Sequence, residues 1–430
     1  MRRPTQFILL VLPMFLLAAC GGGGAGNTED PEPSLITVSG TLLNPDGSAA
    51  SGLPVVVAGR ATTTDTSGAF QVDDVETPYE VTVYHSAFNT VIAFQGLTVE
   101  EPALVIYGTT SSEDRGNSVT FRASGFDPAP PAPPPGHSNW DNSVCSGPVR
   151  FDNCGGRGNP RPVATSRSPK WHGPVSTPAR ILAVQGTVHD SQTTVFTSYS
   201  RLATHHMTFV DGVDTSYTLD YAPVSTGRIE GTTLTPAGYV VTYRGLGLTQ
   251  GDEDWGQISY LQSNPAAPIQ PDFDLATPDN GNFYYYIKVE AEQGEAWIST
   301  RVPVASPEAT DITVEVPAPP QPLQPNADQV GVTQNTLFEW TGMEDAVYTL
   351  NVVSLVPGAP LYLITTADTE ARMPDLSAIG VSLPNAVDYR WGVNAVAPVA
   401  SMDDLATGMA LNSSRGTEAR SGMRNFTTAP

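Results

Sequence analysis

Prolines and glycines interrupt this chain at short intervals, and this confines it to short strands and turns. Each of the two residues occurs 39 times among 430 positions, and only 15% of the residues are charged. No long stretch has the 3.6-residue periodicity of an amphipathic helix, whereas segments rich in Thr and Val with alternating apolar side chains are frequent. The sequence therefore predicts an all-β chain of tandem β-sandwich domains joined by Pro/Gly-rich linkers.

The first twenty residues differ from the rest of the chain. Arg2 and Arg3 precede an apolar run at 7–19, which is shorter than the roughly twenty residues of a membrane span and is typical of a secretory signal peptide at 1–19. The run ends in Leu17-Ala18-Ala19-Cys20, which resembles the lipobox of bacterial lipoproteins. The resemblance implies cleavage before Cys20, a diacylglycerol on its thiol, and a fatty acid such as palmitate on the new amino end.

This resemblance predicts a protein that a lipid holds in the cell envelope. Several acyl chains anchor a protein far more firmly than one chain does. Residues 20–35 are expected to be a flexible, glycine-rich tether that Pro31 and Pro33 stiffen at its far end. Glycine rather than aspartate follows Cys20, which by resemblance to Gram-negative lipoproteins favours the outer membrane, facing the periplasm or the cell surface. An ordinary signal peptide with a chance cysteine is the alternative.

The charge balance disfavours nucleic acid as a partner. The chain carries 21 basic and 44 acidic residues, for a net charge of −23, and phosphate binding needs clustered Lys and Arg. Lysine occurs only at Lys170 and Lys288, so Schiff-base and P-loop chemistries have almost no candidate residue. The expected partners are the membrane, through the N-terminal lipid, and envelope proteins or polysaccharide.

The three cysteines predict one disulfide bond. If Cys20 is acylated, Cys145 and Cys154 remain as a pair, and an exported protein can keep such a bond. It would close a loop worth about 2.5–3 kcal/mol in the chain-entropy model. The alternative is a zinc site with His137 or His172, but the eight residues between the cysteines do not match the usual two-to-four-residue zinc knuckle.

Residues 36–108 are expected to form the first domain. The residues Val38-x-Gly40, the turn Asp46-Gly47 and the segment Thr64-Asp65-x-x-Gly68-x-Phe70 together resemble the carboxypeptidase regulatory-like (transthyretin-like) domain. This resemblance implies a small β-sandwich in which the Thr-Asp segment is a hairpin corner and Phe70 lies in the core. In carboxypeptidases the domain accompanies a zinc peptidase, whose metal motif begins His-x-x-Glu. None of the six histidines here has glutamate three residues later, so the peptidase function does not follow.

Residues 109–225 are expected to form a β domain with a Pro-rich insert at 124–178. Between Pro128 and Pro135, six of eight residues are proline, which favours polyproline II or disorder over sheet. We interpret this insert, which contains the cysteine pair, as an irregular linker or insertion. A recognition loop is the alternative.

Residues 226–318 and 319–430 complete the predicted domains. The segment 228–232 is similar to the Val-x-Gly residues at the start of the first domain. Residues 226–318 are therefore predicted to be a second regulatory-like sandwich. Residues 319–430 follow a Pro-rich linker and resemble a fibronectin type III-like or immunoglobulin-like sandwich with a polar tail. This resemblance rests on the order Phe338-x-Trp340, Tyr348-x-Leu350-x-Val352, Tyr389-x-Trp391-x-Val393, and it implies that both tryptophans lie in the core.

The sequence contains no motif of a known catalytic site. Gly-x-Ser-x-Gly, the Gly-rich phosphate loop and Cys-x-x-Cys are absent. His205 and His206 are adjacent, so on a strand they point to opposite faces and cannot easily bind one metal. Two acidic groups could offer oxygen ligands to Ca²⁺, but neither has EF-hand spacing, and a solvated loop explains both. They are the loop 251–254 and the set Asp272, Asp274, Asp279 and Asn280. We therefore predict no catalytic residue, metal or cofactor.

These observations favour a lipid-anchored envelope protein with a structural or binding role, and not an enzyme. Its sandwich modules would contact envelope polymers or protein partners. The first alternative is a carbohydrate-binding surface lipoprotein, because Tyr284 and Tyr286 on the outward face of a strand could stack on sugars. The second is an unrecognised hydrolase, which would need a concave pocket that gathers a histidine with carboxylates.

Overall fold

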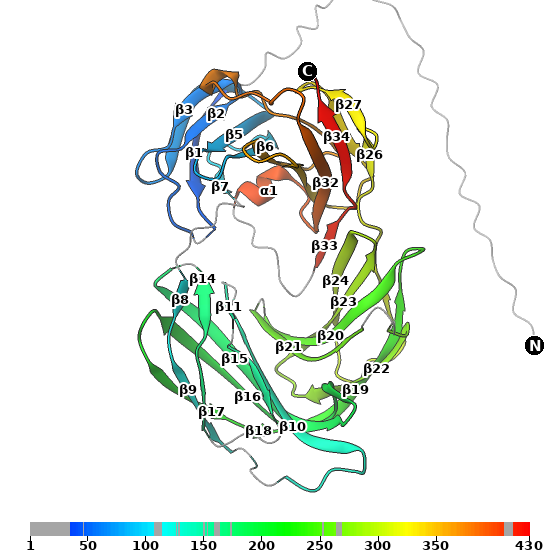
Figure 1. Ribbon diagram of the computed structural model, residues 1–430. Coiled ribbons are helices and arrows are strands. Elements are labelled where there is room, and N and C mark those ends of the chain that lie inside the picture. Colours follow the sequence, from blue (N-terminus) through cyan, green and yellow to red (C-terminus); the bar gives the residue numbers. More distant parts are fainter. Residues whose placement is uncertain are drawn as a thin grey trace, which may run out of the picture. The chain divides into compact units, whose positions relative to one another are not determined.

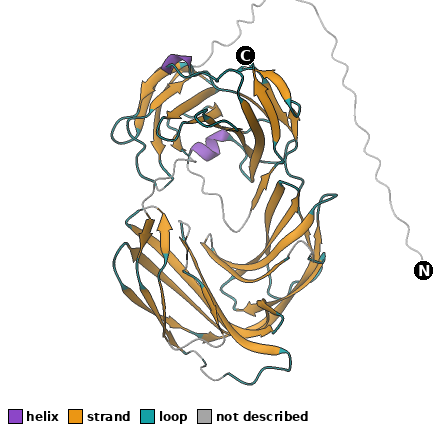
Figure 2. Ribbon diagram, viewed as in Figure 1, coloured by secondary structure: helices purple, strands orange, loops and turns teal. Residues whose placement is uncertain are grey.

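The computed structural model describes residues 35–45, 47–106, 114–125, 127, 130–148, 151–152, 154–158, 164–172, 174–251, 253–263, 269–407 and 416–430. Within these ranges the chain consists of strands and turns, with one short helix, α1 (Met402–Ala406), and one 3₁₀ turn, η1 (Ser377–Ile379) (Figure 2). The predicted all-β class is confirmed. No helix in these ranges is long and apolar enough to span a membrane. Cys20 and the tether at 20–34 lie outside the described residues.

Module 1 (residues 35–106) is a sandwich whose two sheets share one core (Figure 1). Gly40 pairs with Phe70 across the sheet β4-β1-β7, and a Cβ at Gly40 would lie only 2.2 Å from the Phe70 ring. Glycine therefore makes room for Phe70, which is buried as the resemblance implies. The strands are β1 (Leu35–Leu43), β4 (Ala69–Glu76) and β7 (Ala103–Val105) in one sheet, and β2 (Pro54–Val57), β3 (Arg60–Thr63), β5 (Tyr79–His85) and β6 (Thr90–Leu97) in the other.

Module 2 (residues 114–223) is built on two long strands, β15 (Ser176–His189) and β16 (Gln192–Val210). Both faces of this pair are buried: Ile181 and Ala183 belong to one apolar cluster, while Leu182 and Val184 belong to another. This explains the unbroken apolar run at 181–184. The sheet β12-β10-β15-β16-β18 also contains β10 (His137–Ser146), β12 (Gly156–Gly158) and β18 (Ala222–Pro223). The sheets β13-β9-β17 and β11-β14-β8 contain β8 (Asp114–Gly116), β9 (Val119–Ser124), β11 (Phe151–Asp152), β13 (Ala164–Arg167), β14 (Lys170–His172) and β17 (Thr215–Asp220).

The expectation of an irregular insert at 124–178 is wrong for a large part of that stretch. β10 pairs with β15 over ten consecutive residues, from His137–His189 to Ser146–Arg180. The polar residues Asp141, Asn142 and Ser143 are buried in the middle of this strand. Because these side chains are polar, the segment lacks the apolar alternation by which a strand is recognised in a sequence.

Module 3 (residues 225–316) has the same strand order as module 1. β19 (Ser225–Leu234) pairs antiparallel with β22 (Asp272–Asp279) and parallel with β25 (Ile312–Glu315), as β1 does with β4 and β7. The second sheet, β21-β20-β23-β24, corresponds to β3-β2-β5-β6. Such agreement is expected of a second copy of the first domain. The strands of the second sheet are β20 (Val240–Gln250), β21 (Glu253–Gln262), β23 (Tyr284–Gln293) and β24 (Ala296–Val304).

Module 4 (residues 322–430) buries Trp340 and Trp391, as the sequence predicts. One of its sheets has the order β26-β28-β31. The strands are β26 (Pro322–Gln324), β28 (Leu337–Trp340) and β31 (Glu370–Arg372) in that sheet, and β27 (Gln329–Val332), β29 (Val347–Ser354), β30 (Leu361–Thr366), β32 (Asp388–Ala397), β33 (Gly416–Arg420) and β34 (Arg424–Thr428) in the other. The polar tail after Thr407 therefore supplies two strands.

Module 4 also pairs with one edge strand of module 1 and with one edge strand of module 3, the two modules that share a strand order. β30 pairs in parallel with β6 of module 1, and β33 pairs antiparallel with β24 of module 3. β6 and β24 occupy the same place in the shared strand order. In the part of the chain that the structure describes, one continuous sheet thus runs from module 3 through module 4 into module 1. Pairing both edges leaves neither free to associate with other chains.

Candidate functional site

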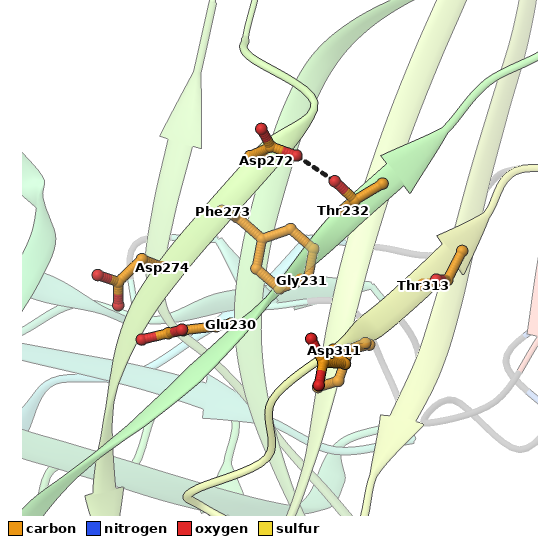
Figure 3. A pocket seen from close by; sticks show the side chains of 9 residues that line it. Glu230, Gly231, Thr232, Asp272, Phe273, Asp274, Asp311 and Thr313 are labelled. Carbon is orange, nitrogen blue, oxygen red and sulfur yellow. Dashed lines mark hydrogen bonds between the residues drawn. The ribbon is translucent and has the colours of Figure 1, made fainter.

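An acidic pocket of about 580 Å³ lies over the sheet β22-β19-β25 of module 3 (Figure 3). Gly231 pairs with both Phe273 and Ile312 across the three strands. Because side chains alternate along a strand, the neighbours of these three residues point outward. The pocket is lined by Glu230, Gly231 and Thr232 of β19, Asp272, Phe273 and Asp274 of β22, and Asp311, Ile312 and Thr313 at the start of β25.

Two of the pocket carboxylates have partners on β19. Arg228 Nε donates to Asp274 Oδ1 over 2.9 Å, and its Nη2 donates to Asp274 Oδ2. This hydrogen-bonded ion pair raises the pKa of Arg228 above its ordinary value. Thr232 Oγ1 donates to Asp272 (Figure 3). All of these groups are exposed enough that each contact contributes little to stability, so the carboxylates remain open to other partners.

A buried arginine beneath this sheet holds the start of β22 in place. Arg244 is 4% exposed, and its guanidinium carbon lies 5.0 Å from the centre of the Phe273 ring. Its Nη2 donates to the carbonyls of Gln270 (2.8 Å) and Pro271 (3.1 Å) and to Thr233 Oγ1 (3.0 Å). Burial lowers the pKa of Arg244 to about 10. Arg244 therefore positions Asp272 and Phe273 without contacting the pocket opening itself.

The carboxylates proposed for calcium are not gathered into one site. Asp279 lies at the far end of β22, where Ser225 Oγ donates to it over 3.2 Å. Asp254 Oδ1 accepts from Gly256 N (2.8 Å) and from the Tyr286 hydroxyl (3.1 Å). Among the described residues, no three acidic, histidine or cysteine side chains are grouped so that they could hold a metal ion. Asp252, also proposed, lies outside those residues.

A second pocket, of about 550 Å³, lies between module 2 and the β20–β21 hairpin. His206 Nε2 lies 3.0 Å from Glu253 Oε2, and Arg180 Nη1 lies 3.6 Å from Glu253 Oε1. The ring of His206 contacts that of Trp255, with centroids 4.9 Å apart. The other lining residues are Pro148, Pro178, Ala179, Met207 and Thr208.

This second pocket brings together a histidine and one carboxylate, which is part of what a hydrolase would need. The carboxylate, however, is shared between Arg180 and His206. The hydroxyl of Ser146, which pairs with Arg180 in the sheet, donates to the Asp254 carbonyl over 2.6 Å. The arrangement therefore joins β15, β16 and β21 as an ion-pair cluster between two modules. These contacts are those of a structural junction.

The two adjacent histidines point to opposite faces of β16, as predicted. His205 contacts the ring of Tyr217 in module 2, with centroids 5.4 Å apart, whereas His206 faces Trp255 of module 3. They therefore do not converge on one position.

The predicted disulfide between Cys145 and Cys154 is present, with the two Cα atoms 5.7 Å apart. Cys154 is almost fully buried, at 2% exposure. His137, proposed as an alternative zinc ligand, contacts His189 across the β10–β15 pair. The side chain of His172, the other alternative, lies outside the described residues. Because the two sulfur atoms are bonded to each other, the cysteines cannot bind zinc while the disulfide is intact.

The expected outward placement of Tyr284 and Tyr286 is wrong for one of the two. Tyr284 is 60% exposed, but Tyr286 is only 1% exposed. Tyr286 lies over Gly247 of the neighbouring strand, where a Cβ would come within 2.0 Å of its ring. Arg301 lies 5.9 Å from the centre of the same ring. Neighbouring residues cover the Tyr286 ring, so a sugar cannot stack on it. The two tyrosines therefore do not form a sugar-stacking pair.

No protein-family model matches the chain, and no curated protein matches it significantly. BcpA, the major pilin subunit of Bacillus cereus, is 10% identical, with a TM-score of 0.15, over 66% of this chain and 99% of that one. A tetra-tandem repeat from the extending region of a large adhesion protein is 9% identical, with a TM-score of 0.16, over 92% of this chain and 99% of that one. These scores are too low to support an inference about function, which must come from the chain itself.

Proposed function

We propose that the chain is a lipid-anchored protein of the cell envelope whose β-sandwich modules have a structural or binding role. In this proposal Cys20 carries the acyl chains and residues 20–35 connect them to β1. The anchor is inferred from Leu17-Ala18-Ala19-Cys20. The observation that supports the structural role is the pairing of β6 with β30, which attaches the module nearest the lipid directly to the last module. Glycine at position 21 favours the outer membrane as the site.

The junction between modules 1 and 4 includes side chains and a shared core as well as the two strands. The backbone N–H of Thr98 donates to Asp403 Oδ1 over 2.8 Å. Asn89 Nδ2 donates to the Gly358 carbonyl over 3.0 Å. The core of module 1 also contains buried residues of module 4, which are Val347, Val399, Met402 and Ala406. A load applied to the N-terminal lipid would therefore pass into module 4 without first passing along modules 2 and 3.

The anchor is tested by labelling cells that express the full chain with radioactive palmitate and separating their membranes. We expect the wild-type protein to carry the label and to sediment with the membranes. The Cys20→Ala variant should carry no label and should appear in the soluble fraction. If this variant still sediments with membranes that have been washed with high salt, the proposed anchor is wrong.

The binding role is tested by pull-down from detergent-solubilised envelopes. Envelope components retained by the wild-type chain in repeated washes are the expected partners. The matched control is the Cys20→Ala chain at the same concentration, because it keeps all four modules. Components bound equally by both forms contact the modules, whereas those bound only by the lipidated form require the anchor. Retention of no envelope component by either form would contradict a binding role and leave the structural one.

A further inference from the structure

Two hairpin turns from opposite ends of the chain lie side by side at the junction of modules 1 and 4. One is the β5–β6 turn, residues 86–89, and the other is the β29–β30 turn, residues 355–360. Leu361 N donates to the Asn89 carbonyl, and Asn89 Nδ2 donates to the Gly358 carbonyl, both over 3.0 Å. We call the two turns together the double tip.

Hydrogen bonds within each turn fix the shape of the double tip. In the first turn, Phe88 N donates to the His85 carbonyl over 3.2 Å, and the Tyr84 hydroxyl donates to Asn89 Oδ1 over 3.0 Å. In the second, the hydroxyl of Ser354 donates to the Val356 carbonyl (2.8 Å) and accepts from its N–H (3.0 Å). The backbone of both turns is therefore fixed before any partner arrives, which lowers the entropic cost of binding.

Large apolar side chains are exposed on the double tip. Leu355 is 53% exposed, Val356 43%, Phe88 38% and Val353, next to the turn, 37%. Single exposed apolar residues are normal on protein surfaces, but a group of them on adjoining turns marks an interaction site.

The double tip also lacks formal charge in a strongly acidic protein. No Asp, Glu, Lys or Arg occurs from 346 to 367 or from 86 to 99, although the whole chain has a net charge of −23. The imidazole of His85 lies beside Phe88, with ring centroids 4.6 Å apart, and burial lowers its pKa. Burial therefore favours the neutral form of His85. Two charged residues lie beside the tip on β32: Asp388, whose backbone carbonyl accepts from Leu355 N over 2.9 Å, and Arg390, which pairs with Val353 in the sheet.

The equivalent turn of module 3 has the opposite character. It joins β23 to β24 through Gly294 and Glu295. Glu295 is exposed and lies 3.7 Å from Arg390 as an ion pair. The two modules share their strand order, so the apolar side chains at 87–88 are not a requirement of this fold.

We propose that the double tip inserts into the apolar layer just below the headgroups of a lipid bilayer and so fixes the orientation of the modules on the membrane. This inference rests on the proposed lipid anchor. A bilayer is the occupant that the observations favour, because the tip is apolar and uncharged while the rest of the chain is repelled by an anionic membrane surface. Asp388, bonded through its backbone to Leu355, and Arg390, paired with Val353, limit insertion to the side chains at the tip.

The anchor makes such a small contact sufficient. Four side chains alone would bind a membrane weakly, but a tethered contact has an effective concentration on the order of millimolar. Cys20 and Leu35 are fifteen residues apart, which span at most about 50 Å. Leu35 pairs with Glu76, close to the start of β5, and the tip lies at the other end of β5, roughly 23 Å away. The tether is therefore long enough for the tip to reach the bilayer.

The experiment uses residues 20–430 with Cys20→Ser and an N-terminal histidine tag, bound to phosphatidylethanolamine–phosphatidylglycerol vesicles that contain nickel-chelating lipid. The result then does not depend on acylation in cells. Ala87→Cys supplies one free thiol for a polarity-sensitive dye, because Cys145 and Cys154 are bonded. Glu295→Cys, in the equivalent turn of module 3, is the matched control. We expect blue-shifted emission and several-fold slower quenching by iodide at position 87 on vesicles, and neither change at position 295.

A second variant tests whether the apolar side chains cause the change. With Phe88→Asp and Leu355→Asp added, the chain should remain on the vesicles and keep its melting temperature, but the dye at position 87 should behave as it does in water. The inference would be overturned if the emission of the dye at position 87 did not shift when the protein with the unaltered Phe88 and Leu355 is bound to vesicles. An equal shift in concentrated vesicle-free protein, which would indicate a second copy as the occupant, or an equal shift at position 295 would also overturn it. Absence of palmitate from the wild-type protein in cells would contradict the anchor alone.

Discussion

Asp65 shows that one residue can determine the shape of a turn when all of its hydrogen-bond partners are close in the sequence. Its Oδ1 accepts from Ser67 Oγ (2.7 Å), Ser67 N (2.8 Å) and Ala69 N (3.0 Å). Gly68 follows with φ +78, a backbone conformation that favours glycine. These contacts all lie within Asp65–Ala69, so the resemblance of the short segment Thr64–Phe70 was enough to predict a corner leading into a buried Phe70.

The first prediction concerns the protonation of Asp65. The Ser67 hydroxyl is the main cause of the lowered pKa of this carboxyl, followed by the two backbone N–H groups. Because the folded pKa lies below the ordinary value, the contribution of these bonds to stability is present above pH 3.8 and is lost as the pH falls through the folded pKa. Ser67→Ala should raise the Asp65 pKa toward its ordinary value, measured by NMR titration of the carboxyl carbon. An unchanged pKa would show that the backbone donors suffice.

Tyr286 shows why the same reasoning fails when partners are remote. Alternation along β23 correctly separates Tyr284 and Tyr286 from the core residues Tyr285 and Ile287. Alternation cannot show that Gly247, on a strand nearly forty residues earlier, leaves the space in which the Tyr286 ring is buried. The same limit applies to Arg244, which is buried among the carbonyls of a segment that a sequence pattern does not connect with it.

Among the elements, β10 shows how polar side chains can make a strand hard to recognise in a sequence. Asn142 Nδ2 donates to the Ile258 carbonyl over 2.8 Å, and Ser146 Oγ donates to the Asp254 carbonyl over 2.6 Å. Ile258 and Asp254 belong to β21, the strand at one end of the long sheet. Polar residues of β10 thus cover carbonyls of an edge strand that would otherwise be open to other chains. The strand is polar because of a neighbour that the sequence alone does not identify.

The pockets could be predicted only in part for a similar reason. Asp272 and Asp274 were recognisable as an acidic group, but the prediction of a solvated loop there is wrong, because both lie on β22. Glu230 and Asp311 join them only because β19 pairs with both β22 and β25. Likewise, nothing in the sequence places Glu253 beside His206. In both pockets the side chains come from strands whose pairing depends on the whole fold.

The second prediction concerns the disulfide that closes the end of β10. Replacing both cysteines, Cys145→Ser with Cys154→Ser, should lower the free energy of unfolding of module 2 by about 2–3 kcal/mol, because the unfolded chain gains the freedom of the opened loop. The measurement is urea unfolding followed by hydrogen exchange of β10 and β15. Reduction of the wild-type protein should reproduce the loss, whereas the double variant should not respond to reductant. An unchanged unfolding free energy would mean that the loop is held by its other contacts.

For the whole molecule, the important result is that modules distant in sequence share a sheet. Short-range patterns indicated some of the strands of modules 1, 3 and 4, and the likeness of segment 228–232 to the start of the first domain predicted a second copy of that domain. They could not identify the parallel pairing of β6 with β30, since strand pairing leaves no signature at a separation of 269 residues, the distance between Asn89 and Gly358. Nor could they identify module 4 as the partner of both equivalent edges, β6 and β24.

The third prediction tests whether the two ends of the chain are coupled through Asn89. This residue has φ +47, which glycine also adopts, so Asn89→Gly removes the bonds to Gly358 and Tyr84 without straining the backbone. Each lost bond is worth about 1 kcal/mol, which corresponds to roughly fivefold faster amide exchange. Hydrogen–deuterium exchange should therefore accelerate at 86–92 and also at 355–363, while the β23–β24 turn stays unchanged. Acceleration confined to 86–92 would show that the turns touch without supporting each other.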